Sequence, residues 1–215
     1  MGWCLHLLNA RGRLSEVEAE IRAALAEAEA RLEGVAPAVA LDVVIRAMDH
    51  PMPPALRVTG ASYGPGRMEL GVDLTSGPFE GLRHEVLKAV YHEFHHVLRW
   101  DGPGYGQTLG AALVSEGLAQ VFVHEMMDCP PEPWEVMPAG VDLRGLCLRA
   151  DAEFDATGYD HGAWFFGGGD LPDGVGYALG RVLVDRVLAE RPGQSALAMA
   201  GEPAEGFRGA LLRLE

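Results

Sequence analysis

Tyr91-His92-Glu93-Phe94-His95-His96 lies inside a stretch, residues 79–98, whose apolar side chains recur with the 3.6-residue period of an α-helix. Residues four positions apart on a helix are offset by about 40° around its axis, so the imidazoles of His92 and His96 point the same way, one turn apart. Two such imidazoles can share one metal ion. Glu93 lies next to the pair, where it can accept a proton from a metal-bound water. His95 is offset by about 100° from His96 and is expected outside the coordination sphere.

A third ligand is expected on a second helix, which the apolar pattern predicts over about residues 108–127. At about 1.5 Å per residue, a chain reversal between the two helices brings Glu116 to about the height of the histidines. Apolar residues surround Glu116 in the sequence, and a buried carboxylate is costly unless a cation or a strong hydrogen bond meets it. We therefore expect His92, His96 and Glu116 to bind one Zn²⁺ per chain. The alternative for Glu116 is a solvated position on the polar side of its helix.

Segments with strand patterns precede these helices. Residues 38–47 and 55–60 are rich in β-branched side chains, and residues 68–74 alternate apolar with polar side chains. The alternation is typical of a strand with one solvated face, so we expect residues 68–74 at an exposed or edge position. There the strand is either a plain edge or the place where a substrate peptide joins the sheet. An amphipathic helix at residues 14–32 is predicted to pack on this sheet, because its heptad-like spacing is too short to favour a coiled coil.

The C-terminal half is predicted to be mainly helical, with helices near residues 141–154 and 174–190. The fold class is therefore α+β, and no linker in the chain is long enough to demand two independent domains. The expected single domain of residues 1–215 consists of an N-terminal helix (1–36), a sheet (37–76), a metal-binding helix pair (77–128) and a helical C-terminal part (129–215).

The charge of the chain restricts its partners. There are 17 Lys and Arg residues against 31 Asp and Glu residues, which gives a net charge of −14. Such a chain repels phosphate backbones and anionic lipid headgroups, so we expect neither nucleic acid nor a membrane surface as a main partner. No apolar run reaches the roughly 18 residues that a membrane-spanning helix needs.

The cysteines and one further histidine give weaker signals. Cys4, Cys129 and Cys147 form neither an even-numbered framework nor a CxxC pair, which favours a reducing compartment and a cytoplasmic location. Neither Cys129 nor Cys147 has an evident His or Asp partner in the sequence, so a thiol nucleophile has little support. His124, two turns after Glu116, either approaches the metal or lies in the core or on the surface.

These segments resemble those of a known enzyme group. The pairing of Tyr91-His92-Glu93-Phe94-His95-His96 with Ser115-Glu116-Gly117-Leu118-Ala119 is similar to the gluzincin branch of zinc metallopeptidases, which includes thermolysin. More specifically, the chain resembles the domain of unknown function 2268 family of predicted zinc-dependent proteases. That family tends to carry late motifs that appear here as Trp164-Phe165-Phe166-Gly167 and Gly176-Tyr177-Ala178-Leu179-Gly180. The resemblance implies a zincin-like fold with an edge strand beside the HExxH helix. In thermolysin-like enzymes an acidic residue follows the ligand Glu by one turn and orients the first histidine, whereas this chain has Gln120 there.

The expected activity is hydrolysis of peptide bonds in a peptide or protein substrate by a metal-activated water, with Glu93 as general base. The oxyanion that forms needs a second electrophile besides the metal. The candidates are His161, whose alternative is a surface position, and Tyr177, whose alternative is packing on the core. Neither the identity of the substrate nor the oligomeric state follows from the sequence.

A second hypothesis is a non-catalytic protein in which the same ligands hold zinc for structure and the cleft binds a peptide or protein. The two hypotheses separate on Glu93, since only a catalytic site depends on its carboxylate. A ferritin-like di-metal protein would need a second Glu-x-x-His motif besides Glu93-x-x-His96, and the chain has none.

Overall fold

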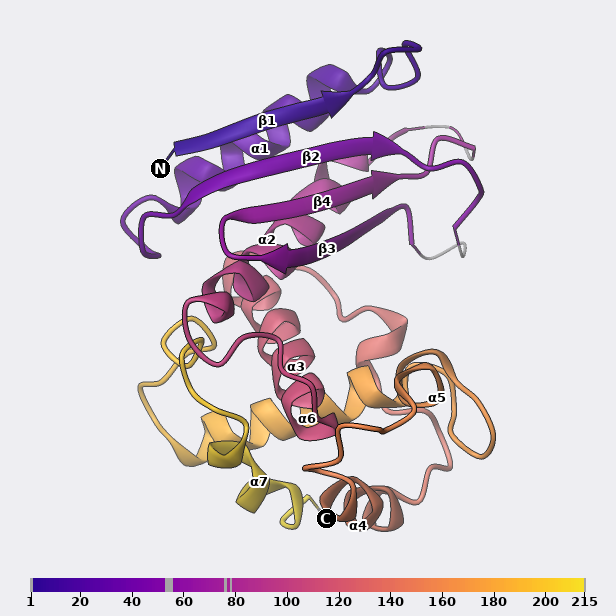
Figure 1. Ribbon diagram of the computed structural model, residues 1–215, viewed down its shortest axis with the longest axis vertical. Helices are drawn as coiled ribbons and strands as arrows, with labels where there is room; N and C mark the ends of the chain where they lie inside the picture. Colours follow the sequence, from indigo (N-terminus) through magenta and orange to yellow (C-terminus); the bar gives the residue numbers. More distant parts are fainter. Residues whose placement is uncertain (1, 53–55, 76, 78, 215) are drawn as a thin grey trace. The chain divides into compact units, whose positions relative to one another are not determined.

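The computed structural model describes residues 2–52, 56–75, 77 and 79–214. The chain divides into two compact units, Met1–Val97 and Leu98–Glu215. The first unit combines a sheet with helices, and the second is helical (Figure 1). The predicted α+β class is therefore confirmed.

A four-stranded mixed sheet forms the centre of the first unit (Figure 1). The strand order is β1-β2-β4-β3; β1 pairs parallel with β2, β2 pairs parallel with β4, and β3 pairs antiparallel with β4. The strands are β1 (Gly2–Leu8), β2 (Ala40–Ala47), β3 (Val58–Gly64) and β4 (Arg67–Val72).

Two features of this sheet differ from the sequence prediction. Residues 2–8 form a strand that was not predicted, because this short segment precedes any turn signal and contributes only alternate half-buried side chains. The prediction that residues 68–74 lie at an edge is wrong, because β4 is paired on both sides and buries Met68, Leu70 and Val72. Within the described ranges, the edge strand next to β4 is β3. Ala55, the first residue of the predicted strand at 55–60, lies outside those ranges.

Two helices, α1 (Glu18–Leu32) and α2 (Leu82–Trp100), cover one face of the sheet (Figure 1). The backbone N–H of Trp3 donates to Glu29 of α1, and the Trp3 ring lies 5.9 Å from the ring of Phe94 in α2. The guanidinium of Arg83 in α2 also donates to Glu27 of α1. The two predicted helices are thus confirmed, although α1 begins four residues after the predicted Leu14. The core of this unit comprises Ile21, Leu25, Leu41, Val43, Ile45, Met68, Leu70, Val86, Val90 and Phe94.

The second unit is built on two long helices that cross closely. A Cβ atom on Gly117 of α3 would lie 2.1 Å from the carbonyl oxygen of Gly180 in α6, and a Cβ atom on Gly180 would lie 2.3 Å from the carbonyl oxygen of Leu113. Only glycine permits this approach of the two backbones. The helical elements are α3 (Leu109–Met126), η1 (Pro133–Glu135), α4 (Leu143–Ala152), α5 (His161–Phe166), α6 (Val175–Glu190) and α7 (Glu205–Leu211).

The three longer helices of this unit agree with the predictions for residues 108–127, 141–154 and 174–190, and the short elements α5 and α7 were missed. A helix of six or seven residues is too short to display a full amphipathic period.

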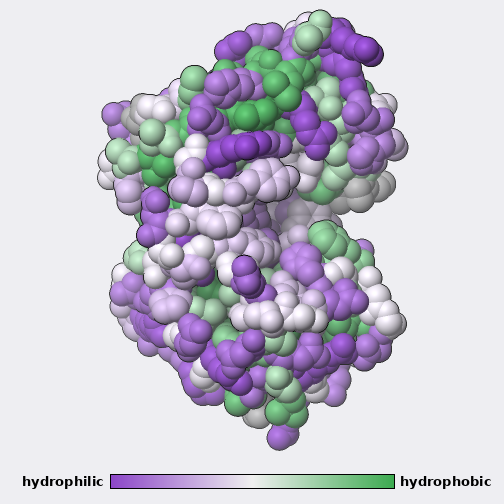
Figure 2. All heavy atoms as spheres, viewed as in Figure 1, coloured by the Kyte–Doolittle hydropathy of each residue, from purple (hydrophilic) through white to green (hydrophobic). Residues whose placement is uncertain are grey.

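Hydrophilic residues cover most of the visible face in Figure 2, and a smaller hydrophobic area lies over the sheet of the first unit. Within the described residues, no helix combines the length and the apolar character that a membrane-spanning helix needs.

Candidate metal centre

His92 and His96 face each other on consecutive turns of α2, as their spacing predicted. Their Nε2 atoms are 3.1 Å apart, and their rings are nearly perpendicular, at 81°. Two nitrogens that bind one tetrahedral zinc at about 2.0–2.1 Å lie about 3.3 Å from each other, so the observed separation is close to that of a shared ion. His96 is buried and His92 is half-buried, which leaves one side of the pair accessible. The first unit therefore presents two converging imidazole donors.

Glu93 lies between this pair and the edge strand β3. Its side chain is 5% exposed, and Ser62 of β3 places its hydroxyl 3.1 Å from Oε2 and 2.9 Å from the backbone oxygen of Glu93. A Cβ atom on Gly60 would lie 2.4 Å from Cγ of Glu93, so the glycine of β3 provides the space that the glutamate occupies. The edge strand thus fixes the position of the carboxylate that was predicted as general base. Neither Gly60 nor Ser62 was predicted, because nothing in the sequence pairs them with α2.

Glu116 lies in α3 of the second unit and is 6% exposed. The phenol of Tyr105 donates a hydrogen bond of 2.7 Å to Oε1 of Glu116. Burial, and next the negative charge of Glu116, raise the pKa of Tyr105, so this phenol stays protonated and acts as a donor. The alternative of a solvated Glu116 is excluded. Tyr105 was missed by sequence reasoning, since it lies in the loop before α3 with no periodic signal.

A buried arginine supports this arrangement. Arg99 donates from Nε to Oγ of Ser115 at 2.9 Å, and from Nη1 to the carbonyl oxygen of Ala200 at 3.0 Å. Ser115 in turn donates to the carbonyl oxygen of Tyr105 at 3.1 Å. Burial lowers the pKa of Arg99 to about 10, which still leaves it charged at neutral pH. The loop that carries Tyr105 is therefore anchored to α3 one residue before Glu116.

The two predicted electrophiles lie in one aromatic cluster of the second unit. The His161 ring stacks on Phe165 at 4.5 Å, and the Tyr177 ring meets Phe165 edge-on at 4.9 Å. The hydroxyl of Tyr159 is 2.9 Å from Nδ1 of His161. Burial, and next the charge of Glu116, raise the pKa of Tyr159 to about 12, so its phenol is a protonated group within the electrostatic reach of Glu116. Tyr159 was not singled out from the sequence, although it lies two residues before His161.

Gln120 follows Glu116 by one turn of α3 and is 1% exposed. Neither atom of its side-chain amide has a hydrogen-bond partner within residues 2–52, 56–75, 77 and 79–214. An unsatisfied buried amide destabilises the folded protein by about 1–3 kcal/mol. The Gln120 amide is therefore suited to form its hydrogen bonds when a ligand is bound. His124, the other polar residue considered on this helix, is engaged by Glu135 at 2.7 Å.

The donor chemistry of the two units fits zinc. The first unit offers two neutral-capable imidazole nitrogens that converge, and the second offers a buried carboxylate held by a phenol. Zinc takes such N and O donors in catalytic sites, usually three from the protein with a further position for water. The chemistry of these groups therefore agrees with a hydrolytic zinc site.

Comparison with known proteins agrees with this chemistry. No curated protein matches the chain. A family model with the description "Predicted Zn-dependent protease" matches residues 21–207, a range that contains His92, Glu93, His96, Glu116, His161 and Tyr177. Because the match covers most of the chain, the protein belongs to the domain of unknown function 2268 family of predicted Zn-dependent proteases.

Proposed function

We propose that the protein is a zinc-dependent metallopeptidase of the gluzincin type, with a zincin-like fold, in which both units act as one catalytic domain. The observation that carries the proposal is the convergence of the two Nε2 atoms of His92 and His96 beside the buried carboxylate of Glu93. A purely structural zinc site has no need of a carboxylate at that position, because its ligands close the coordination sphere. The family description supports the same reaction class.

In this proposal His92, His96 and Glu116 hold one Zn²⁺. Bound by three protein ligands, zinc lowers the pKa of a coordinated water to about 7 and polarises the carbonyl of a substrate. Tyr105 keeps the carboxylate of Glu116 oriented through its short hydrogen bond. Gln120 replaces the acidic residue of thermolysin-like enzymes, and its buried amide is the group we assign to accept an imidazole N–H from a ligand histidine.

Glu93 is the general base. Its carboxylate accepts the proton of the attacking water and later transfers it to the leaving amine. Ser62 can donate to Oε2, which leaves the other carboxylate oxygen to receive the proton. The space left by Gly60 lets the side chain take this position without strain.

The oxyanion of the tetrahedral intermediate requires donors from the protein. We assign this role to Tyr177 and His161, which share the ring of Phe165 as a packing partner. The hydrogen bond between Tyr159 and Nδ1 leaves Nε2 of His161 as the nitrogen that can face a substrate. The phenol of Tyr177 and this imidazole then donate to the carbonyl oxygen as negative charge develops on it.

The substrate class is a peptide or a protein segment in extended conformation. The edge strand β3 carries the two residues that contact Glu93, so a peptide that adds to this edge places its backbone next to the general base. Nucleic acid is a poor partner for a chain with a net charge of −14. The pattern of three free cysteines supports a reducing, cytoplasmic compartment.

The test is a comparison of Glu93→Gln with Glu85→Gln, a substitution in the same helix at a residue whose carboxylate forms an ion pair with Lys88. Cleavage of an unstructured protein substrate and of a fluorogenic peptide library is measured together with zinc content. We expect Glu93→Gln to retain about one zinc per chain and to lose about 10²–10⁴-fold in turnover, while Glu85→Gln keeps both. Zinc binding without cleavage of any substrate by the wild-type protein would instead favour a non-catalytic, metal-stabilised binding protein.

A further inference from the structure

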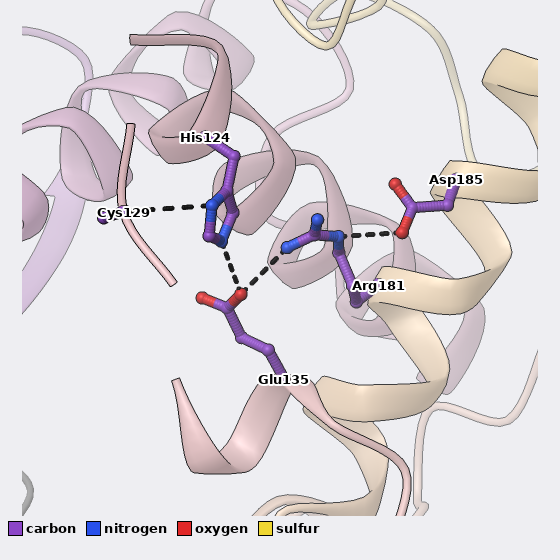
Figure 3. Close-up of polar contacts among 5 residues, drawn as sticks. All are labelled: His124, Cys129, Glu135, Arg181 and Asp185. Atoms are coloured by element: carbon purple, nitrogen blue, oxygen red, sulfur yellow. Dashed lines mark hydrogen bonds and ion pairs between the residues drawn. The ribbon is translucent and has the colours of Figure 1, made fainter. Parts of the chain in front are cut away.

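The second unit contains a cysteine, a histidine and a glutamate in series, and the histidine lies on α3, two turns after Glu116 (Figure 3). The Sγ atom of Cys129 lies 3.7 Å from Nδ1 of His124. The opposite ring nitrogen, Nε2, lies 2.7 Å from Oε2 of Glu135. The three residues come from the end of α3, the loop after it and η1. A nucleophile next to a base that a third group orients is the arrangement of an activated nucleophile. From the sequence this thiol has little support, because its partner lies five residues earlier, on a helix.

The orientation of the imidazole suits proton transfer better than metal binding. Cys129 and Glu135 contact opposite nitrogens of the same ring, so their ligand atoms do not converge on one point (Figure 3). Glu135 accepts a hydrogen bond from Nε2–H, and the neutral tautomer with that hydrogen has its lone pair on Nδ1, facing the sulfur. Nδ1 can therefore take the proton of the Cys129 thiol. The resulting imidazolium lies between a thiolate and a carboxylate, and both stabilise it.

An ion pair with Arg181 holds Glu135 where it can accept a hydrogen bond from His124. Arg181 of α6 donates from Nη1 to Oε2 of Glu135 at 2.8 Å and from Nε to Asp185 at 2.9 Å (Figure 3). The side chain of Glu135 is 5% exposed, and the guanidinium of Arg181 compensates the charge of this buried carboxylate. The arginine thus holds the glutamate as an acceptor for His124, and Asp185 compensates part of its charge. Asp128 and Glu132, on either side of Cys129 in the sequence, are the nearest further acidic groups along the chain.

The three cysteines differ in their surroundings. Cys129 is half-buried, so small reagents can reach its sulfur. Cys147 is buried, and burial raises the pKa of its thiol to about 11, which makes it inert at neutral pH. Cys4 is exposed on β1, in the other unit. Cys4 also lies near a histidine that contacts a carboxylate, His6 with Asp42, but these three residues are exposed, whereas the sulfur of Cys129 forms a hydrogen bond with His124 beside the buried Glu135.

We propose that Cys129 is a reactive thiol, activated by His124 and Glu135, that undergoes thiol–disulfide exchange with small disulfides and so is a site of reversible S-thiolation. The thiolate of Cys129 attacks one sulfur of the disulfide; a new S–S bond to Cys129 forms and the original S–S bond breaks. The departing thiolate takes the proton from the His124 imidazolium and leaves as a thiol. Two thiol–disulfide partners exchange, so no external oxidant or reductant is needed. Acyl transfer would additionally require an oxyanion hole, whereas a departing sulfur carries its own charge.

The test is the rate of modification at each cysteine of the full-length protein, measured by peptide mass mapping between pH 5 and 9. The reagents are iodoacetamide and oxidised glutathione, with N-acetylcysteine as the reference thiol. An ordinary thiol with a pKa of about 8.5 is only about 3% thiolate at pH 7. We expect Cys129 to react at least about tenfold faster than the reference at pH 6–7 and to form the mixed disulfide with glutathione, while Cys147 stays unmodified. A Cys129 rate and pH profile equal to those of N-acetylcysteine would overturn the proposal, and this comparison requires no variant.

Two histidine variants test whether His124 activates the thiol of Cys129. His124→Asn removes the proton acceptor and is expected to lower the Cys129 rate at pH 7 by about tenfold and to shift its pH profile towards that of the reference thiol. His84→Asn, at an exposed position of α2, is the matched control and is expected to leave the profile unchanged. Far-ultraviolet circular dichroism confirms that both variants are folded. A folded His124→Asn protein with the wild-type rate and profile would contradict the role of His124.

Discussion

The backbone of Gly60 in β3 lies so close to Glu93 in α2 that a Cβ atom there would be 2.4 Å from Cγ and 2.5 Å from Oε1 of the glutamate. The edge strand β3 therefore also shapes the site, because the absence of a side chain at Gly60 leaves the space that the Glu93 side chain occupies. The atoms that a larger residue would displace belong to the Glu93 side chain and not to the backbone. A change at Gly60 is thus expected to move Glu93, the proposed general base, while it leaves the fold and the proposed ligand histidines in place.

Gly60→Ala tests this relationship. The added methyl group pushes the Glu93 carboxylate away, and a displacement of about 1 Å at a catalytic group can cost about 10²-fold in rate. We expect kcat to fall by roughly that factor, with zinc content unchanged. Gly64→Ala is the control on the same strand, because a Cβ atom there meets nothing within 4 Å. Equal kcat values for the two variants would show that Glu93 does not depend on this space.

Tyr105→Phe tests how Glu116 is held. The substitution removes the phenol that donates to Oε1 and leaves the ring in its buried site. A group that hydrogen-bonds to a metal ligand and orients it contributes about 10–100-fold to metal affinity, so we expect the dissociation constant for zinc to rise by that factor. Competition with a chromophoric chelator measures the constant. Tyr63→Phe, on an exposed ring of β3, serves as the control. An unchanged zinc affinity in Tyr105→Phe would mean that the phenol does not orient a metal ligand.

The phenols near Glu116 stabilise the folded protein only up to an alkaline pH. A neutral phenol whose pKa is raised on folding binds its proton more tightly in the folded state, so its contribution is complete below about pH 10 and is lost as the pH rises further. For Tyr159 this window extends from about 10 to about 12. We expect near-ultraviolet absorbance titration to show a step later than that of a free tyrosine, whose pKa is about 10, and Tyr159→Phe to diminish that late step. A late step that persists undiminished in Tyr159→Phe would contradict the assignment.

Gly117→Ala tests the close crossing of α3 and α6. The methyl group would meet the carbonyl oxygen of Gly180 at 2.1 Å, a backbone atom that cannot move without separating the helices. Overpacking of this kind costs about 1–3 kcal/mol. For a chain of this length we expect the midpoint of thermal unfolding to fall by about 2–12 °C. Gly201→Ala, where a Cβ atom meets nothing within 4 Å, should change it little. Equal midpoints in the two variants would show that the helices can separate at no cost.

The sequence predicted the parts of the molecule that depend on periodic local patterns. The convergence of His92 and His96 follows from helical geometry alone, and the burial of Glu116 follows from the apolar residues around it. The long helices were found for the same reason. Zincin-like details of the fold, such as the arrangement of the two units around one ion, stay a prediction.

What the sequence did not predict depends on contacts between distant segments. The alternation in residues 68–74 was interpreted as a strand at an exposed or edge position, yet β4 pairs with β2 on one side and with β3 on the other, so that β3 is the edge beside it. Ser62, Tyr105 and Tyr159 act on residues in other elements, and no local period marks such pairs. The contact between Cys129 and His124 spans only five residues, but it depends on how the chain turns after α3, which no periodic pattern marks.

The most direct test of the central claim is an anomalous diffraction experiment at the zinc absorption edge, on crystals of the wild-type protein grown with zinc. We expect a peak bonded at about 2.0–2.2 Å to Nε2 of His92, to Nε2 of His96 and to a carboxylate oxygen of Glu116. The peak should vanish in His96→Asn and persist in His84→Asn. A zinc-loaded protein whose anomalous peak lies elsewhere, with neither histidine ring bonded to it, would contradict the account.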